Sequence, residues 1–374
     1  MKKIFIFLAL LVSAICINAQ NQSVKQAEEK AKSLVQVNDA SWRILVYDSP
    51  DEWFGNEEAI AIAENVLLYQ FEIGGWPKNT QMQKPLTEEE KQEIIAQKPS
   101  NTGATTDNGA TVMEMDFLSK IYKHTHDERY REAFVRGLNY LIKAQYPNGG
   151  FPQFYPLRKG YYSHITYNDD SMYRIMTLLK NIAKEHNHFD IIVDKETAQK
   201  AQTAFNLGVE CILKTQFVQE GVLTGWCAQY DENTLLPAKA RAYELPSLSG
   251  QEGANLVLLL MEIENPSPEI INAVRSAVAW FDKTRIQGIR VEAFRDENGK
   301  RDRRVVEDPT APDIWARFYT LEDNTPFFCD RDGIPRATLA EIGQERRGGY
   351  GWYSLVPNQI FKKYPKWEEK IKKR

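Results

Sequence analysis

The chain has 374 residues and a formal net charge of −4, and 43% of its residues are hydrophobic. A chain of this length can bury a sizeable core without disulfide staples. The acidic balance excludes a non-specific nucleic-acid-binding protein, which would present a basic field, so an anionic ligand would have to be held by a local basic cluster.

The N-terminus has the pattern of an export signal. Two lysines precede an apolar run, interrupted only by Ser13, that ends at Ile17, and the small residue Ala19 follows. A charged start, a short apolar stretch and a small cleavage residue predict a Sec-type signal peptide over residues 1–19. The run is too short for a membrane span, which needs about 20 apolar residues. We expect an exported protein, periplasmic or extracellular, with a leader segment at 20–50 and one domain at 51–374.

Helical periodicity dominates the chain from residue 59 to about 281. Apolar residues recur at i, i+3, i+4 and i+7 in AIAIAENVLLYQ, YREAFVRGLNYLIKAQY, TAFNLGVECILKTQF and INAVRSAVAWFDKTRI. Only VLTGW, GIRVEAF and the segment around RRVVED favour short strands, which we expect to form hairpins on a rim.

The ends of these helices repeat. A glutamine followed by an aromatic residue recurs at Gln70, Gln145 and Gln216, and glycine follows each time. A period near 70 residues holds two helices and a loop, so each unit is predicted to be a helical hairpin that ends at a glycine cap. The predicted fold is mainly α: an α/α toroid, or incomplete α/α barrel, of about three hairpins. Its loops and helix N-termini would gather at one end.

Two similar polar motifs, TTDNGAT and TYNDDSM, stand where helices of the repeat begin. One interpretation is that both are helix caps, because Asp, Asn and Thr accept hydrogen bonds from a first helical turn. The other places Asp107, Asn108 and Asp169 around one cleft, where two carboxylates and an amide oxygen suit Ca²⁺. Asp170 is an alternative ligand to its neighbour Asp169. The two interpretations can hold together.

The C-terminal third supplies positive charge. Arg241 lies in KARAYELPSLSG, Arg317 in DIWARFYTLED and Arg331 in FFCDRDG. Any single arginine is most simply an exposed or ion-paired surface residue. The aromatic residues around Arg317 and Arg331 are unusual for a solvated loop, which favours a basic partner for the acidic motifs.

Six motifs between Gly74 and Tyr353 occur in the same order as in one family, and the likeness to that family runs from about Glu52 to Tyr353. They are GGWPKN, TTDNGAT, HITYNDDSM, RAYELPSLSGQEG, WARFYTLEDNTPFFCDRDG and RRGGYGWY. Together they resemble the pectate lyases of polysaccharide lyase family ten. The resemblance implies a secreted catalytic domain that cleaves polygalacturonate by Ca²⁺-assisted β-elimination and leaves 4,5-unsaturated oligogalacturonides.

The resemblance also implies roles for the basic residues. The family's base is an arginine, and by its position in FFCDRDG that role falls to Arg331. Because the pKa of arginine lies above about 12, neighbouring charge, desolvation or acidification of the substrate proton must assist it. Arg241 and Arg317 match positions that hold substrate carboxylates, and Lys78 in GGWPKN would assist as a point charge.

Two other functions remain compatible with the residues. An α/α toroid can carry a glycoside hydrolase, with Asp107 and Asp169 as its acid and base, and products with saturated ends would identify it. A non-catalytic pectin-binding protein would bind without turnover. In each case we expect a monomer that binds polygalacturonate or pectin, with no nucleic-acid partner and no membrane span.

Overall fold

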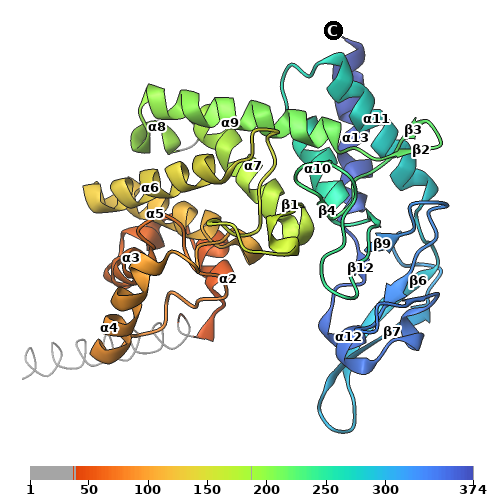
Figure 1. Cartoon of the computed structure of the whole chain (residues 1–374), viewed down its shortest axis with the longest axis horizontal. Coiled ribbons are helices and arrows are strands. Elements are labelled where there is room, and N and C mark those ends of the chain that lie inside the picture. Colours follow the sequence, from red (N-terminus) through yellow and green to blue (C-terminus); the bar gives the residue numbers. More distant parts are fainter. Residues whose placement is uncertain (1–36, 38, 187, 374) are drawn as a thin grey trace, which may run out of the picture.

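The computed structural model describes residue 37, residues 39–186 and residues 188–373. The predicted signal peptide and much of the predicted leader therefore lie outside the described residues. The described chain is mainly helical (Figure 1). The longer helices are α2 (Trp42–Asp48), α3 (Glu57–Tyr69), α4 (Glu88–Gln97), α5 (Val112–Thr125), α6 (Glu128–Ala144), α7 (Ser171–Ala183), α9 (Lys195–Lys214), α10 (Glu252–Met261), α11 (Pro268–Lys283) and α13 (Pro357–Lys372). The described residues also form the short α-helices α8 (Phe189–Ile192) and α12 (Gln344–Gly349).

Three helical hairpins form the body of the molecule, and they confirm the predicted α/α toroid. The helices pair as α5 with α6, α7 with α9, and α10 with α11. Along the row, α3 packs on α5 at one end, α7 contacts α10 in the middle, and α13 packs on α10 and α11 at the other end (Figure 1). Helix α2, from the end of the predicted leader, packs on α5.

The glutamines of the sequence repeat hold successive units together. The side-chain amide of Gln70 donates to the carbonyls of Gly74 (2.9 Å) and Ala133 (2.8 Å), joining the turn after α3 to helix α6. Gln145 and Gln216 make the same pair of bonds, each to its own turn and to the next outer helix. Because a buried amide left unpaired costs about 1–3 kcal/mol, a glutamine is required at each of these positions.

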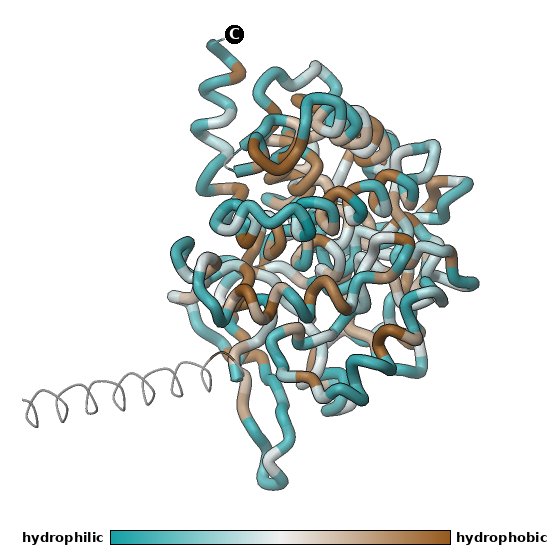
Figure 2. Tube along the Cα trace, turned by 90° about the vertical axis from the view of Figure 1, so that its left-hand side faces the viewer, coloured by the Kyte–Doolittle hydropathy of each residue, from teal (hydrophilic) through white to brown (hydrophobic). Residues whose placement is uncertain are grey.

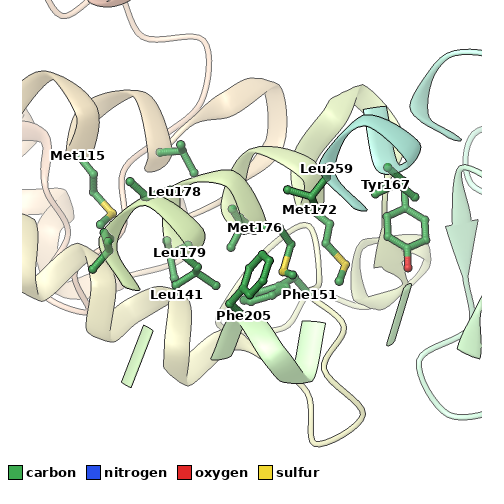
Figure 3. Packing of buried hydrophobic residues seen from close by; sticks show 14 of the residues in the cluster. Met115, Leu141, Phe151, Tyr167, Met172, Met176, Leu178, Leu179, Phe205 and Leu259 are labelled. Atoms are coloured by element: carbon green, nitrogen blue, oxygen red, sulfur yellow. The ribbon is translucent and has the colours of Figure 1, made fainter. Parts of the chain in front are cut away.

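Buried tryptophans fix the inner side of the same turns. Trp76, Trp226 and Trp315 are almost fully buried, and each indole N–H donates to a carbonyl of a preceding helix at 2.7–2.8 Å. Methionine, leucine and phenylalanine side chains fill the space between the helix layers (Figure 3). The hydrophobic residues concentrate in these packed helices, whereas the protruding loop at the lower edge is largely hydrophilic (Figure 2).

The strands are short and form only two-stranded antiparallel pairs among the described residues. The predicted rim hairpin exists as β6 (Ile289–Arg295) paired with β7 (Arg301–Glu307). The remaining strands are β1 (Ile165–Thr166), β2 (Val218–Gln219), β3 (Val222–Leu223), β4 (Gln229–Tyr230), β5 (Leu248–Ser249), β8 (Trp315–Ala316), β9 (Phe318–Tyr319), β10 (Phe328–Cys329), β11 (Pro335–Arg336) and β12 (Tyr353–Ser354). No helix in the described part of the chain is long and apolar enough to cross a membrane.

Candidate active site

The two polar motifs form tight turns in front of inner helices. The first is a 3-10 turn at Asp107–Gly109 before α5, and the second is one at Asn168–Asp170 before α7. The cap residues of α5 and α7 make no side-chain cap hydrogen bond, so the interpretation of these motifs as helix caps is wrong. Asn108 and Asp169 adopt left-handed backbone conformations, with φ of 54° and 53°. Strain of this kind persists where function requires a particular side-chain direction.

The two turns lie side by side. They contact each other directly, and the hydroxyls of Thr106 and Ser171, which flank the two turns, lie 2.8 Å apart in a buried hydrogen bond. The structure thus brings Asp107 and Asp169 to one face, as the repeat predicts. We call the first turn with its neighbours the Asp107 corner and the second the Asp169 corner.

A lysine neutralises the Asp107 corner. The ammonium group of Lys78 is hydrogen-bonded to Asp107 Oδ2, and 36% of the Lys78 side chain is exposed while Asp107 is buried. Asn108 donates through Nδ2 to Asn79 Oδ1 at 2.9 Å, and its own amide oxygen accepts no hydrogen bond from the described residues. Sequence analysis missed Asn79, although it directly follows Lys78 in GGWPKN.

A buried arginine neutralises the Asp169 corner. Only 4% of the Arg317 side chain is exposed, and its Nη2 donates to Asn168 Oδ1 at 2.8 Å and to Asp169 Oδ1 at 2.9 Å. The same nitrogen donates to Glu252 Oε1 at 2.5 Å. The Arg317 guanidinium also lies 4.5 Å from the centroid of the Tyr350 ring.

The sequence predicts Glu252 only as part of a capping box with Ser249 and gives it no role in the site. The Ser249–Glu252 spacing favours a capping box, and Ser249 Oγ does accept from the backbone N–H of Glu252 at 3.0 Å. The Glu252 carboxylate, however, also faces Arg317 and accepts from the backbone N–H of Asp169 at 3.2 Å. Burial raises the pKa of Glu252, whereas the charge of Arg317 lowers it. In the sequence, the only sign of this role is that Glu252 stands at the start of the strongly apolar helix α10.

Arg241 lies next to the Asp169 corner. Its Nη2 is 4.0 Å from Asp169 Oδ2, and its Nε donates to Glu244 at 2.7 Å. Although burial lowers the pKa of Arg241, the ion pair with Glu244 raises it above the usual arginine range. Glu244 also accepts from the Tyr350 hydroxyl at 2.8 Å, so Tyr350 joins Arg241 to Arg317.

The contacts of the described residues do not bring Arg331 to either corner. Its side chain is 64% exposed, and its guanidinium donates twice to the carboxylate of Glu345, at 3.0 Å each. These bonds raise the pKa of Arg331. The same carboxylate accepts from Arg346, and the two arginines together lower the pKa of Glu345 to about 2. Sequence analysis identified neither Glu345 nor this pairing.

Asp170 faces a different part of the molecule from Asp169. Its Oδ1 accepts from Asn255 Nδ2 at 2.7 Å, and its Oδ2 lies 3.9 Å from Arg174. The choice of Asp169 over Asp170 as a ligand stays a prediction, and these contacts agree with it.

Two other features lie away from the corners. A hollow of about 610 Å³ runs between β6 and Leu355, and none of the predicted site residues lines it. Three potential metal ligands, His164, Asp231 and Glu232, lie within 4.8 Å of one another. His164 Nδ1 lies 3.2 Å from Glu232 Oε2, so these two ligands are already hydrogen-bonded to each other.

Comparison with known proteins identifies the class. The sequence model of the pectic acid lyase family matches residues 70–361. A family 10 polysaccharide lyase from Cellvibrio cellulosa is similar in structure, with 36% identity over 83% of this chain and 95% of that one and a TM-score of 0.71. An aspartate-to-alanine mutant of that lyase in complex with trigalacturonic acid matches at 35% identity, 83% and 96% coverage and a TM-score of 0.70. No curated protein gave a significant match.

Fold and site together define a polysaccharide lyase. The chain belongs to the pectic acid lyase family. This result selects the lyase over the glycoside hydrolase and the non-catalytic binding protein that the sequence left open.

Proposed function

We propose that the protein cleaves polygalacturonate by Ca²⁺-assisted β-elimination, with an arginine as the base, and that it is exported. The observation that carries the proposal is the set of charges on one face. Two carboxylates on adjacent turns, Asp107 and Asp169, stand beside three cations, Lys78, Arg241 and Arg317. An anionic polymer needs the cations, and a bridging divalent ion needs the carboxylates.

The donors of the two corners fit Ca²⁺ in chemistry. Asp107, Asn108 and Asp169 would hold the ion, because carboxylate and amide oxygens are the ligands it prefers. The two turns that carry these side chains contact each other, and neither motif supplies a side-chain cap to its helix. When bound, the ion would withdraw charge from a substrate carboxylate and acidify the adjacent C5 proton.

The arginines would bind and orient the uronate. Arg317 is fixed by three acceptors on Nη2, while its buried Nε has no hydrogen-bond partner among the described residues. Because Arg317 is buried, it would orient Asp169, while the partly exposed guanidinium of Arg241 would bind a substrate carboxylate, which it matches in shape. Lys78 would contribute a mobile positive charge, since about a third of its side chain is exposed.

Two arginines are candidates for the base. The family resemblance assigns the role to Arg331, but the contacts favour Arg241. Arg241 is only partly exposed and its Nη2 lies 4.0 Å from Asp169 Oδ2, which places it beside the proposed metal ligands, although its ion pair with Glu244 raises its pKa. Arg331 is exposed and held by Glu345. Arg241 is paired with Glu244 and Arg331 with Glu345. In either case, this ion pair must break before the arginine can take a proton from C5.

The product of polygalacturonate cleavage tests the function. Purified protein with Ca²⁺ should raise the ultraviolet absorbance of unsaturated uronide, and a chelator should abolish the rise. New saturated reducing ends without that absorbance would contradict elimination. Export is tested by the N-terminal sequence of protein recovered outside the cytoplasm, which should begin near residue 20.

A further inference from the structure

A loop of the chain, residues 155–162, starts and ends between the two acidic corners. At its base, the backbone N–H of Gln153 donates to Tyr162 O at 3.0 Å. The carbonyl of Gln153 accepts from the backbone N–H of Thr106 at 3.2 Å and from Thr105 Oγ1 at 2.5 Å. Thr106 directly precedes Asp107, so the base of the loop is fixed to the Asp107 corner.

The loop carries an arginine without an acidic partner. The guanidinium carbon of Arg158 lies 3.8 Å from the centroid of the Phe154 ring, and Nη2 donates to the carbonyl of Thr102. Among the described residues Arg158 makes no ion pair, whereas Arg241, Arg317 and Arg331 each bind a carboxylate. Arg158 is therefore an exposed cation, held in place and available to an anion.

Aromatic rings connect Arg158 to the corners. Lys78 Nζ lies 5.5 Å from the same Phe154 centroid. Tyr162 meets Phe154 edge-on at 5.4 Å, and Tyr161 lies 4.1 Å from Tyr162 between ring centroids. Burial raises the pKa of the Tyr161 hydroxyl, and the charges of Arg241 and Glu244 also act on it. The loop thus runs from the Lys78 side of the site to the Arg241 side.

We propose that Arg158, with Phe154, Tyr161 and Tyr162, forms an additional binding subsite for a uronate residue of the same polysaccharide chain, beyond the position of cleavage. Arg158 binds the carboxylate of that uronate, and the half-buried tyrosines offer an apolar face to its ring. Stacking on Phe154 and the bond to Thr102 hold the guanidinium before the ligand arrives, which reduces the entropy lost on binding. This inference rests on the proposed polygalacturonate substrate.

Chain length separates this subsite from the cleavage site. A short trimer can fill the cleavage site alone, whereas long chains also reach Arg158. We expect Arg158→Ala to raise KM for polygalacturonate about tenfold with kcat nearly unchanged, as for loss of one charge-assisted hydrogen bond. Cleavage of trigalacturonate should change less than twofold. Arg158→Lys, which keeps the charge without the planar stack, should fall between wild type and Arg158→Ala.

The neighbouring exposed residue Lys159 supplies a matched control, because Lys159→Ala removes the same charge from the same loop. Equal losses on trimer and polymer, no loss with Arg158→Ala, or an equal loss with Lys159→Ala would overturn the subsite. Migration in native gels containing polygalacturonate measures the contact without turnover, and Arg158→Ala should be less retarded than wild type. Equal retardation would overturn the subsite even for an inactive protein. A wild type that cleaves neither substrate instead contradicts the proposed function.

Discussion

The two acidic corners occupy equivalent places in the repeat but are built differently. Asp107 is balanced by one partly exposed lysine, Lys78, on a flexible stem. Asp169 is balanced by Arg317, which is buried among three acceptors, and it also faces Arg241. A mobile ammonium can exchange with another cation at little cost, whereas a buried arginine cannot leave its partners. The Asp107 corner is thus adapted for exchange and the Asp169 corner for fixed orientation.

The largest expected effect is at Arg317. Replacing it by alanine leaves Glu252 and Asp169 without their buried cation, which should lower the free energy of unfolding by about 3–5 kcal/mol. Urea unfolding followed by circular dichroism measures this change. Lys78→Ala, the equivalent change at the exposed pair, should cost about 1 kcal/mol or less. Similar losses for the two variants would show that the corners do not differ as described.

Next in size is the loss of activity at Asp169. Asp169→Asn should reduce kcat by about 100-fold or more, as expected for removal of one preorganised charge at the reacting centre. Asp170→Asn makes the same change one residue along the same turn and is the control. It should retain most of the activity, because Asp170 faces Asn255 instead. The reverse order, read from initial rates of unsaturated product, would make Asp170 the site residue.

The third prediction is that the free energy of unfolding depends on pH through Glu114, on the helix that follows the Asp107 corner. Glu114, on α5, is buried and accepts from Trp42 Nε1 at 2.8 Å, and burial raises its pKa from 4.5 to about 7. Because the folded pKa exceeds the unfolded one, this contribution to stability is full below pH 4.5 and is lost as the pH rises to about 7. The loss is at most about 3 kcal/mol. Glu114→Gln should flatten the profile of unfolding free energy between pH 4.5 and 8; an unchanged slope would assign it to other groups.

The smallest expected effect concerns metal affinity. Lys78 occupies an oxygen of Asp107, so Lys78→Met should tighten Ca²⁺ binding about two- to fivefold, the equivalent of one exposed ion pair. Calorimetric titration of Ca²⁺ into substrate-free protein measures this. Lys91→Met, which removes an exposed cation paired with Glu88 on α4, is the control. Unchanged affinity in Lys78→Met would mean that the lysine and the ion do not compete.

The sequence predicted the fold because its signals are local and repeated. Gln70, Gln145 and Gln216 recur with the period of the helical hairpin, and each makes the same two bonds. The corners were predictable for the same reason, since each polar motif stands before an inner helix. One interpretation failed: these side chains do not cap their helices, because left-handed turns direct them elsewhere.

The pairing of charges was not predictable. Arg241, Arg317 and Arg331 look alike in sequence, yet one is half-buried beside Asp169, one is buried and one is exposed on Glu345. Which carboxylate meets which arginine depends on contacts between residues up to 148 positions apart. The role of Glu252 in the site was missed for the same reason, because its motif reads as a local cap.

The most direct test of the account compares alanine variants of Arg241 and Arg331. Initial rates of unsaturated product from polygalacturonate are measured with saturating Ca²⁺ and substrate, so that the comparison reports kcat. If the corner geometry selects the base, Arg241→Ala abolishes the reaction while Arg331→Ala retains a measurable kcat. If Arg331→Ala is inactive while Arg241→Ala still forms product, the account is contradicted and the role of base belongs to Arg331.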